Sequence, residues 1–329
     1  MKRKWVKIML TAAAASLVAG GICMGAGVAM GGSPAFYINK DGIHVKETVS
    51  ATDRADYVLE NTPVGALKQL DIQLKEADLS IVSGDTWSVE YVMDGARLEP
   101  EYSLENGVLK IKEGGYRNTS ANYYGFWGWG NSWWDWQNET SKVSPYVKIT
   151  VPEGGKLAEA TLENAYGDIR VEKKLGADNA VIRSHDGEVY LDGWEGNTIT
   201  LDATYGSVVT GSLDGKDVSV KNHDGKVQVG ELCSDTADFE LQYGNLEAAI
   251  NGTKSVEVEN HDGNIELELI GGIDKYGVSL HTDDGEIRTP QGKVEPDEYD
   301  DSSDFIRMKG ETAGIRVYST YGDIRIRER

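Results

Sequence analysis

Three stretches of twelve residues decide the fold: VSVKNHDGKVQV at 218–229, ADFELQYGNLEA at 237–248 and VEVENHDGNIEL at 256–267. In each stretch, residues one, three, ten and twelve are apolar, and residue eight is glycine. The alternation of apolar and polar residues is the pattern of a half-buried β-strand. Asp before Gly is typical of a tight turn. Each stretch therefore predicts two short strands joined by a turn.

The same pattern recurs from residue 160 to the end of the chain, and one glycine marks each copy. Successive glycines are separated by 19 to 22 residues, except for a last interval of 37. A fixed spacing over this length indicates a stacked repeat architecture. The last interval is close to two repeats, which predicts that an acidic insertion has replaced one copy. The eight turn glycines are Gly167, Gly187, Gly206, Gly225, Gly244, Gly263, Gly285 and Gly322.

Two all-β folds fit these repeats. In a β-solenoid, each repeat of about 19 residues is one coil, and successive coils are about 4.8 Å apart. The apolar positions of the coils then stack into internal columns. In a β-sandwich, each glycine marks a hairpin, and the hairpins pack face to face. The regular spacing favours the solenoid, because its coils must share one perimeter whereas hairpins need not.

The composition excludes several classes of protein. The chain has 33 Lys and Arg residues against 54 Asp and Glu residues, a net charge of −21. Such an acidic surface repels phosphate backbones, so we expect no nucleic-acid partner. The two cysteines, Cys23 and Cys233, supply neither a disulfide framework nor a cysteine-based zinc site.

The N-terminus predicts a membrane anchor. Residues 8–30 carry no charge and follow a basic tip with Lys2, Arg3, Lys4 and Lys7. A helix of this length spans about 34 Å, enough to cross a hydrocarbon core of about 30 Å. The basic tip should stay in the cytoplasm, which places the rest of the chain outside. The alternative is a signal peptide cleaved near residues 27–29, which would release a secreted protein.

The remaining chain divides into a polar spacer and a repeat ectodomain. The spacer covers 31–62 and contains a predicted short strand at 42–45. The ectodomain covers 63–329 and has two insertions, an aromatic one at 114–145 and an acidic one at 291–304. We expect the acidic insertion to be a solvated surface loop.

Residues beside the turn glycines form a second pattern, which has a longer period. The residue before the glycine alternates between Tyr and Asp, with tyrosines at 166, 205, 243 and 321, and each of three Asp copies follows a histidine. Imidazole and carboxylate are ligands for divalent cations. In a solenoid, however, these histidines lie two coils apart, so a turn role is the first interpretation and a metal site the alternative. The tyrosine column predicts packing, with carbohydrate stacking as its alternative. The His-Asp pairs are His185 and Asp186, His223 and Asp224, and His261 and Asp262.

The aromatic insertion is the strongest candidate for a contact surface. Its aromatic residues are interleaved with glycines and fit neither a helix nor an alternating strand, so we expect a loop. Clustered exposed apolar residues mark interaction surfaces. Three roles stay open: insertion at a membrane interface, stacking on a glycan or another partner, and capping of the open end of the solenoid. The candidate binding residues are Tyr123, Tyr124, Phe126, Trp127, Trp129, Trp133, Trp134 and Trp136.

The repeats resemble the bacterial putative-adhesin family of β-strand-repeat envelope proteins. The resemblance covers about residues 65–329 and rests on turn motifs such as YGDI at 166–169 and 321–324, on DGEV at 186–189, and on VKITVPEG at 147–154. It implies a right-handed β-helix-like fold and an adhesin or envelope role. It implies no catalytic residue.

The sequence therefore predicts a non-catalytic, membrane-anchored extracytoplasmic β-solenoid without a cofactor. Its expected partners are the membrane and either cell-wall glycan or another envelope protein. No nucleophile-elbow, zinc-protease or phosphate-loop motif occurs in the sequence. An accessory role in envelope-stress signalling is the alternative, and a glycan-active β-helix enzyme ranks third.

Overall fold

The computed structural model describes residues 36–39, 42–45, 55–95, 97–115, 123–124, 144–296, 302–307 and 314–329, together with Ser16 and Gly20. The chain divides into two compact units. The first unit covers 1–55 and 115–142, and the second covers 56–114 and 143–329. The predicted anchor lies outside the described residues apart from Ser16 and Gly20. Among the described residues, no helix is long and apolar enough to cross a membrane.

The first unit contains a small antiparallel sheet. β1 (Phe36–Asn39) pairs with β2 (Gly42–Val45) on one side and with β9 (Tyr123–Tyr124) on the other. β2 occupies the short strand predicted in the spacer. β9 lies within the aromatic insertion, where the sequence predicted a loop. The other candidate binding residues of that insertion lie outside the described residues.

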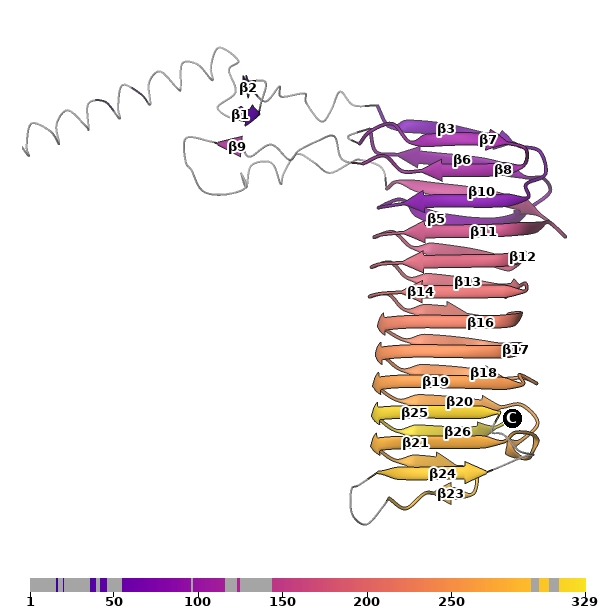
Figure 1. Ribbon diagram of the computed structural model, residues 1–329. Coiled ribbons are helices and arrows are strands. Elements are labelled where there is room, and N and C mark those ends of the chain that lie inside the picture. The colour runs from indigo at the N-terminus through magenta and orange to yellow at the C-terminus, as the bar shows by residue number, and fades with distance from the viewer. Residues whose placement is uncertain are drawn as a thin grey trace, which may run out of the picture. The chain divides into compact units, whose positions relative to one another are not determined.

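The second unit is a β-solenoid with one 3-10 helix, η3 (Ile273–Lys275), among its described residues. Its strands form one continuous 23-stranded sheet that coils upon itself (Figure 1). The strands are β3 (Tyr57–Pro63), β4 (Gln69–Leu74), β5 (Asp78–Gly84), β6 (Ser88–Met93), β7 (Glu101–Glu105), β8 (Val108–Lys112), β10 (Tyr146–Pro152), β11 (Lys156–Asn164), β12 (Ile169–Ser184), β13 (Val189–Glu195), β14 (Thr198–Ala203), β15 (Val208–Thr210), β16 (Leu213–Asp224), β17 (Val227–Tyr243), β18 (Leu246–Ile250), β19 (Ser255–Asp262), β20 (Ile265–Leu269), β21 (Val278–Asp284), β22 (Ile287–Thr289), β23 (Gly292–Lys293), β24 (Ser303–Arg307), β25 (Ile315–Tyr321) and β26 (Ile324–Glu328).

Equivalent strands of neighbouring coils pair in parallel. Ile199 of β14 is opposite Val218 of β16, which is opposite Ala237 of β17. These pairs form the first face of the solenoid, and the strands after each turn glycine form the second face, as in β15, β17 and β18. Parallel pairing excludes the sandwich of hairpins, in which neighbouring strands run antiparallel. The solenoid prediction is confirmed.

The predicted apolar columns form the core. Their residues from every repeat are buried, including Val220 and Phe239 on the first face and Val227 and Leu246 on the second. A third short side, which was not predicted from the sequence, closes the coils after the second face. Its buried column contains Leu175, Trp194, Leu213, Leu232 and Ile250.

The C-terminal coil is stacked out of sequence order. β25 pairs in parallel with β19 on one side and with β21 on the other, and β26 likewise lies between β20 and β22 (Figure 1). Between β22 and β25, where the sequence predicted an acidic insertion in place of one copy, the described residues add no parallel coil. The ends of the acidic segment are not loop as predicted, because β23 and β24 add antiparallel strands to β22 and β21.

The charges of the last coil are complementary to those of its neighbour. The outward residues of the coil formed by β19 and β20 are largely acidic, whereas those of the last coil are largely basic. Arg327 lies 2.9 Å from Glu266, and Arg329 lies 3.4 Å from Glu268. Each exposed pair contributes little, up to about 1 kcal/mol. The alternative order would bring the acidic coil against β21, which ends in Asp283 and Asp284, and like charges would then be adjacent.

A histidine clamp joins the last strands of the first face. His281 of β21 has Nδ1 2.8 Å from an Asp304 oxygen of β24 and Nε2 2.9 Å from an Asp283 oxygen. Tyr318 of β25 donates its hydroxyl to the other Asp283 oxygen at 2.6 Å and stacks on the imidazole, with ring centroids 5.2 Å apart. The hydrogen bond to Asp304, and then that to Asp283, raise the pKa of His281. The clamp thus holds β24 over the coil when His281 is protonated.

The stacking order predicts the effect of a buried charge in the last coil. Ile324→Asp places an unpaired carboxylate in the core, at a cost of several kcal/mol. Hydrogen exchange should then increase not only in 315–328 but also in 278–289, because β21 and β22 contact the solenoid through that coil. Ile306→Asp, at an exposed position of β24, is the control. Unchanged protection of 278–289 would mean that β21 stacks directly on β19.

The clamp predicts a pH dependence of stability. Because the folded-state pKa of His281 is raised above 6.5, its stabilisation is complete below about pH 6.5 and is lost as the pH rises through the raised value. The pKa of Asp283 is lowered by Tyr318 and then by His281, so a second loss occurs in strong acid. The His281 ring resonances in an NMR titration should report a pKa above 6.5. As the pH rises into the alkaline range, the melting temperature of His281→Gln should fall less than that of the wild type. A His281 pKa below 6.5 would contradict the clamp.

Candidate functional site

The turn glycines line up along one edge of the solenoid. A Cβ added to Gly187 or Gly206 would lie 2.0 Å from the carbonyl oxygen of the preceding turn glycine, and one on Gly244 would lie 1.9 Å from that of Gly225. No side chain fits at these positions without backbone movement. Neighbouring turns therefore pack backbone to backbone, and the side chains beside the glycines are directed outwards.

These side chains form a continuous ladder of tyrosine and histidine rings. The Tyr166 and His185 ring centroids are 6.3 Å apart, and those of His185 and Tyr205 are 5.3 Å apart. The later neighbours are separated by 5.5 to 5.9 Å. The tyrosines are about half exposed, from 49 to 60%. The ladder contains, in order, Tyr166, His185, Tyr205, His223, Tyr243, His261 and Tyr321.

Register explains why two different positions meet in one ladder. Tyr243 lies opposite Asp224 in one neighbouring coil and opposite Asp262 in the other. Its ring contacts the histidine that precedes each Asp, with centroids 5.5 Å from His223 and 5.9 Å from His261. The tyrosine and histidine columns that the sequence showed separately are thus one surface.

The ladder separates the predicted metal ligands. A tyrosine ring lies between successive histidines, and within one coil His185 Nδ1 is 3.1 Å from the Asp186 carboxylate. Among the described residues, no group of three or more His, Cys, Asp or Glu side chains is placed to hold a metal ion. The structure therefore shows a contact within the His185–Asp186 pair but does not bring the three pairs to one another.

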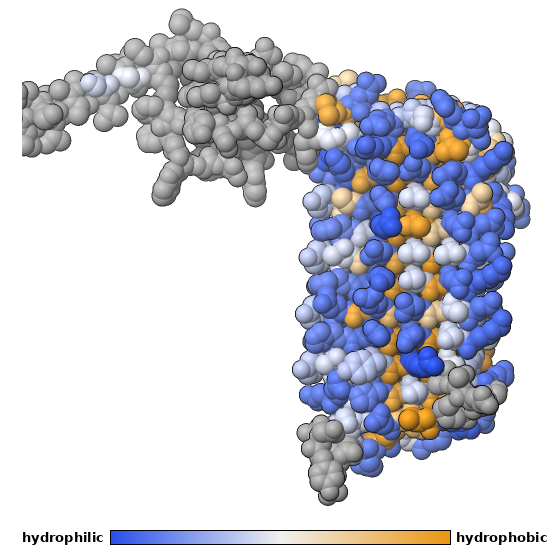
Figure 2. Space-filling view, viewed as in Figure 1, coloured by the Kyte–Doolittle hydropathy of each residue, from blue (hydrophilic) through white to orange (hydrophobic). Residues whose placement is uncertain are grey.

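A shallow groove of about 500 Å³ runs beside the ladder on the first face. One wall consists of outward residues four positions before the turn glycine, such as Lys221, Glu240 and Glu259. The other wall contains His223 and His261, which belong to the ladder. Figure 2 shows the solenoid with columns of hydrophilic side chains and narrow hydrophobic strips between them. The groove therefore follows the solenoid axis and crosses successive coils.

A buried polar column holds the turns in place. The residue three positions before each glycine points inwards although it is often polar. Asn222 donates to the Gly206 carbonyl at 2.9 Å, and Asn260 donates to the carbonyls of Gly244 and Gly263 at 3.1 and 2.9 Å. The sequence analysis assigned no role to these asparagines. Their inward position in the alternation was the signal that could have identified them.

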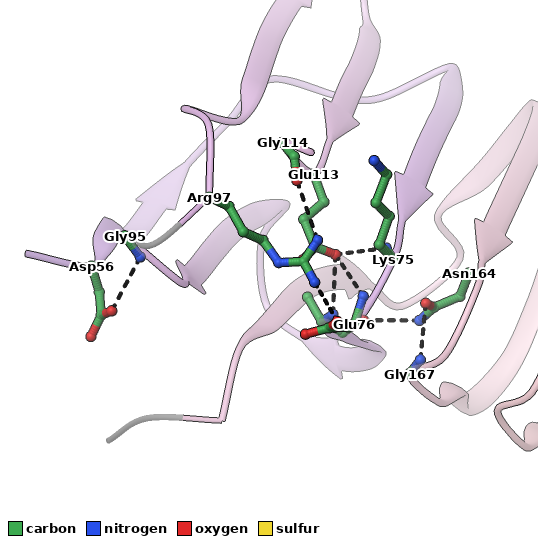
Figure 3. A network of polar contacts seen from close by, with 10 residues as sticks. Asp56, Lys75, Glu76, Gly95, Arg97, Glu113, Gly114, Asn164 and Gly167 are labelled. Carbon is green, nitrogen blue, oxygen red and sulfur yellow. Dashed lines mark hydrogen bonds and ion pairs between the residues drawn. The ribbon is translucent and has the colours of Figure 1, made fainter. Parts of the chain in front are cut away.

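In the coil that carries the aromatic insertion, Glu113 occupies this column. One carboxylate oxygen accepts the backbone N–H groups of Lys75, Glu76 and Ala77 at 2.6, 2.9 and 3.1 Å. The other lies 3.2 Å from Arg97, which also contacts the Glu76 carboxylate at 2.5 Å (Figure 3). Removing one partner of such a buried pair costs about 3–5 kcal/mol.

The aromatic insertion starts at the ladder edge. β8 ends at Lys112 and is in register with β4, while β10 begins at Tyr146 and is in register with β5. The insertion therefore replaces the tight turn that other coils make at glycine. The Glu113 network fixes the last residues before it, because Arg97 also donates to the Gly114 carbonyl at 3.4 Å.

Comparisons with known proteins give a family but no curated relative: no curated protein matches this chain. The chain is similar to the solved structure of a putative adhesin from Parabacteroides merdae, with 11% identity, a TM-score of 0.45, and coverage of 83% of this chain and 97% of that chain. A putative adhesin from Bacteroides fragilis has 10% identity and a TM-score of 0.39, with 84% and 99% covered. A putative lipid binding protein from Parabacteroides distasonis has 12% identity and a TM-score of 0.43, with 83% and 97% covered.

One family model matches the chain and assigns it to a family. That model, Toastrack DUF4097, matches residues 67–327, which is nearly the whole second unit. The match covers almost the same residues as the resemblance to the putative-adhesin repeats. The chain belongs to the Toastrack DUF4097 family.

Proposed function

We propose that this protein is a non-catalytic, adhesin-like binding protein of the cell envelope. In this proposal the N-terminal apolar run anchors it in the membrane and the solenoid lies outside the cell. The observation that carries the proposal is the tyrosine-histidine ladder, a continuous row of seven exposed rings on a rigid edge. Aromatic side chains dominate many protein interfaces, because each buries a large area on binding.

Two features suit the ladder to binding. Its backbone is held by parallel pairing on both sides and by buried side chains such as Asn222 and Asn260. A rigid surface loses little conformational entropy when a ligand binds, so more of the contact energy appears as affinity. Its rings also repeat from coil to coil, which suits a partner with its own linear repeat. The aromatic insertion, which starts from the same edge, is proposed as a second contact surface.

A binding assay with the full-length chain in lipid nanodiscs tests the proposal. We expect the protein to sediment with purified bacterial cell walls. Tyr205→Ala combined with Tyr243→Ala should weaken binding roughly thirtyfold, since each ring contributes on the order of 1 kcal/mol. Tyr190→Ala removes an exposed tyrosine of the second face and should leave binding unchanged.

The controls decide between this role and the alternatives. Circular dichroism should show the same β-sheet signal in the wild type and in both variants. Equal binding by the ladder variant and the wild type would reject the ladder as the contact surface. Absence of binding to walls by the wild type would reject the adhesin-like role and favour envelope-stress signalling.

A further inference from the structure

We propose that the groove beside the ladder binds a neutral glycan chain that runs parallel to the solenoid axis. The inference rests on the proposed function, because it specifies the ligand of the same edge. The groove is lined by two columns of outward side chains that repeat from coil to coil, so a bound chain meets the same positions along its length. The first column contains Asp202, Lys221, Glu240, Glu259 and Tyr318, and the second contains Thr204, His223, Gln242, His261 and Thr320.

The charge of the groove selects against anionic polymers. Its carboxylates belong to Asp202, Glu240 and Glu259, while its one lysine, Lys221, is already paired with Glu240. The whole chain carries a net charge of −21. A polyanion would therefore meet like charge both in the groove and over the surrounding surface. A neutral chain avoids this repulsion and can still accept and donate hydrogen bonds.

The backbone of the first face disfavours an extended peptide as the ligand. Peptides that add to a sheet use the unpaired N–H and C=O groups of an edge strand. The strands that line the groove each have a parallel neighbour on both sides: β16 lies between β14 and β17, and β19 lies between β17 and β25. Only side chains are available for recognition, so the ligand must be bound through its own substituents.

The available side chains match the two surfaces of a sugar. Thr204, Gln242 and Thr320 offer hydroxyl and amide groups for hydrogen bonds to sugar hydroxyls. The adjoining ladder rings, such as Tyr205 and Tyr243, offer apolar area for the C–H faces of a pyranose. The ladder places one ring in each coil from Tyr166 to Tyr321, with neighbouring centroids 5.3 to 6.3 Å apart. A chain that runs along the solenoid axis therefore meets one ring per coil.

Calorimetric titration of the full-length chain in nanodiscs tests the ligand class. The probes are the neutral hexasaccharides cellohexaose and chitohexaose and the anionic hexagalacturonate. We expect saturable binding of a neutral hexasaccharide that is at least tenfold tighter than that of its disaccharide, because a longer chain contacts more coils. Binding should change little between low and high salt, and hexagalacturonate should bind at least tenfold more weakly.

Variants locate the ligand in the groove. Gln242→Ala should weaken hexasaccharide binding roughly fivefold through loss of hydrogen bonds, whereas Tyr190→Ala should not. The variant Asp202→Asn, Glu240→Gln, Glu259→Gln removes the repulsion and should gain affinity for hexagalacturonate. Tighter binding of hexagalacturonate than of both neutral chains by the wild-type protein would overturn the inference.

The outcome also separates this inference from the proposed function. Binding to purified walls without binding to either neutral hexasaccharide would overturn the glycan assignment and leave the adhesin-like role in place. If that binding were lost on protease treatment of the walls, the partner would be a protein. Failure to bind walls and sugars alike would reject both.

Discussion

The structure depends on one close approach, that of the backbone of each turn to the backbone of the next. At Gly206 a Cβ would lie 2.0 Å from the Gly187 carbonyl oxygen, so only glycine allows the coils to meet at this edge. Parallel pairing continues on both sides of the turn, and Asn222 bonds the Gly206 carbonyl from inside. The turn glycines therefore permit the strand spacing that parallel pairing sets on both faces, and the core columns follow the same spacing.

The candidate site is a consequence of this spacing. With no side chain at the glycine, the residues just before it are brought within ring-contact distance of their neighbours in the next coil. The groove arises in the same way, because outward residues at two fixed positions repeat in every coil that lines it. Where the turn is replaced by the aromatic insertion, Glu113 takes the place of the inward polar residue and binds the amides of the next turn. The edge at which the turns pack together therefore also carries the tyrosine-histidine ladder.

Much of the fold could be predicted from sequence, because the determinants are local and repeated. The alternation around Gly225 and Gly244 indicated the strands, the turns and the inward residues, all of which are buried. The third side was missed because the distance of Trp194, Leu213 and Leu232 from the turn glycine differs from that of Leu175 and Ile250. The place of the last coil could not be predicted, since β25 has the same pattern as its neighbours and that pattern does not specify which coils it contacts. For the site, the types of ring could be predicted from the sequence, but only the register joins Tyr243 to His223 and His261. The Glu113–Arg97 pair could not be predicted from the sequence, because its two residues are not related by any repeat.

The most direct test of this account is the free energy of unfolding of Gly206→Ala compared with that of Gly176→Ala. Both changes add one methyl group, but a Cβ at Gly176 makes only ordinary contact, 3.4 Å from the nearest atom of Lys156. We predict that denaturant unfolding shows Gly206→Ala to be destabilised by about 1–3 kcal/mol, as expected for overpacking against backbone. Gly176→Ala should differ from the wild type by about 1 kcal/mol or less. Equal stability of the two variants would contradict the claim that the close approach of the coils at this edge requires glycine.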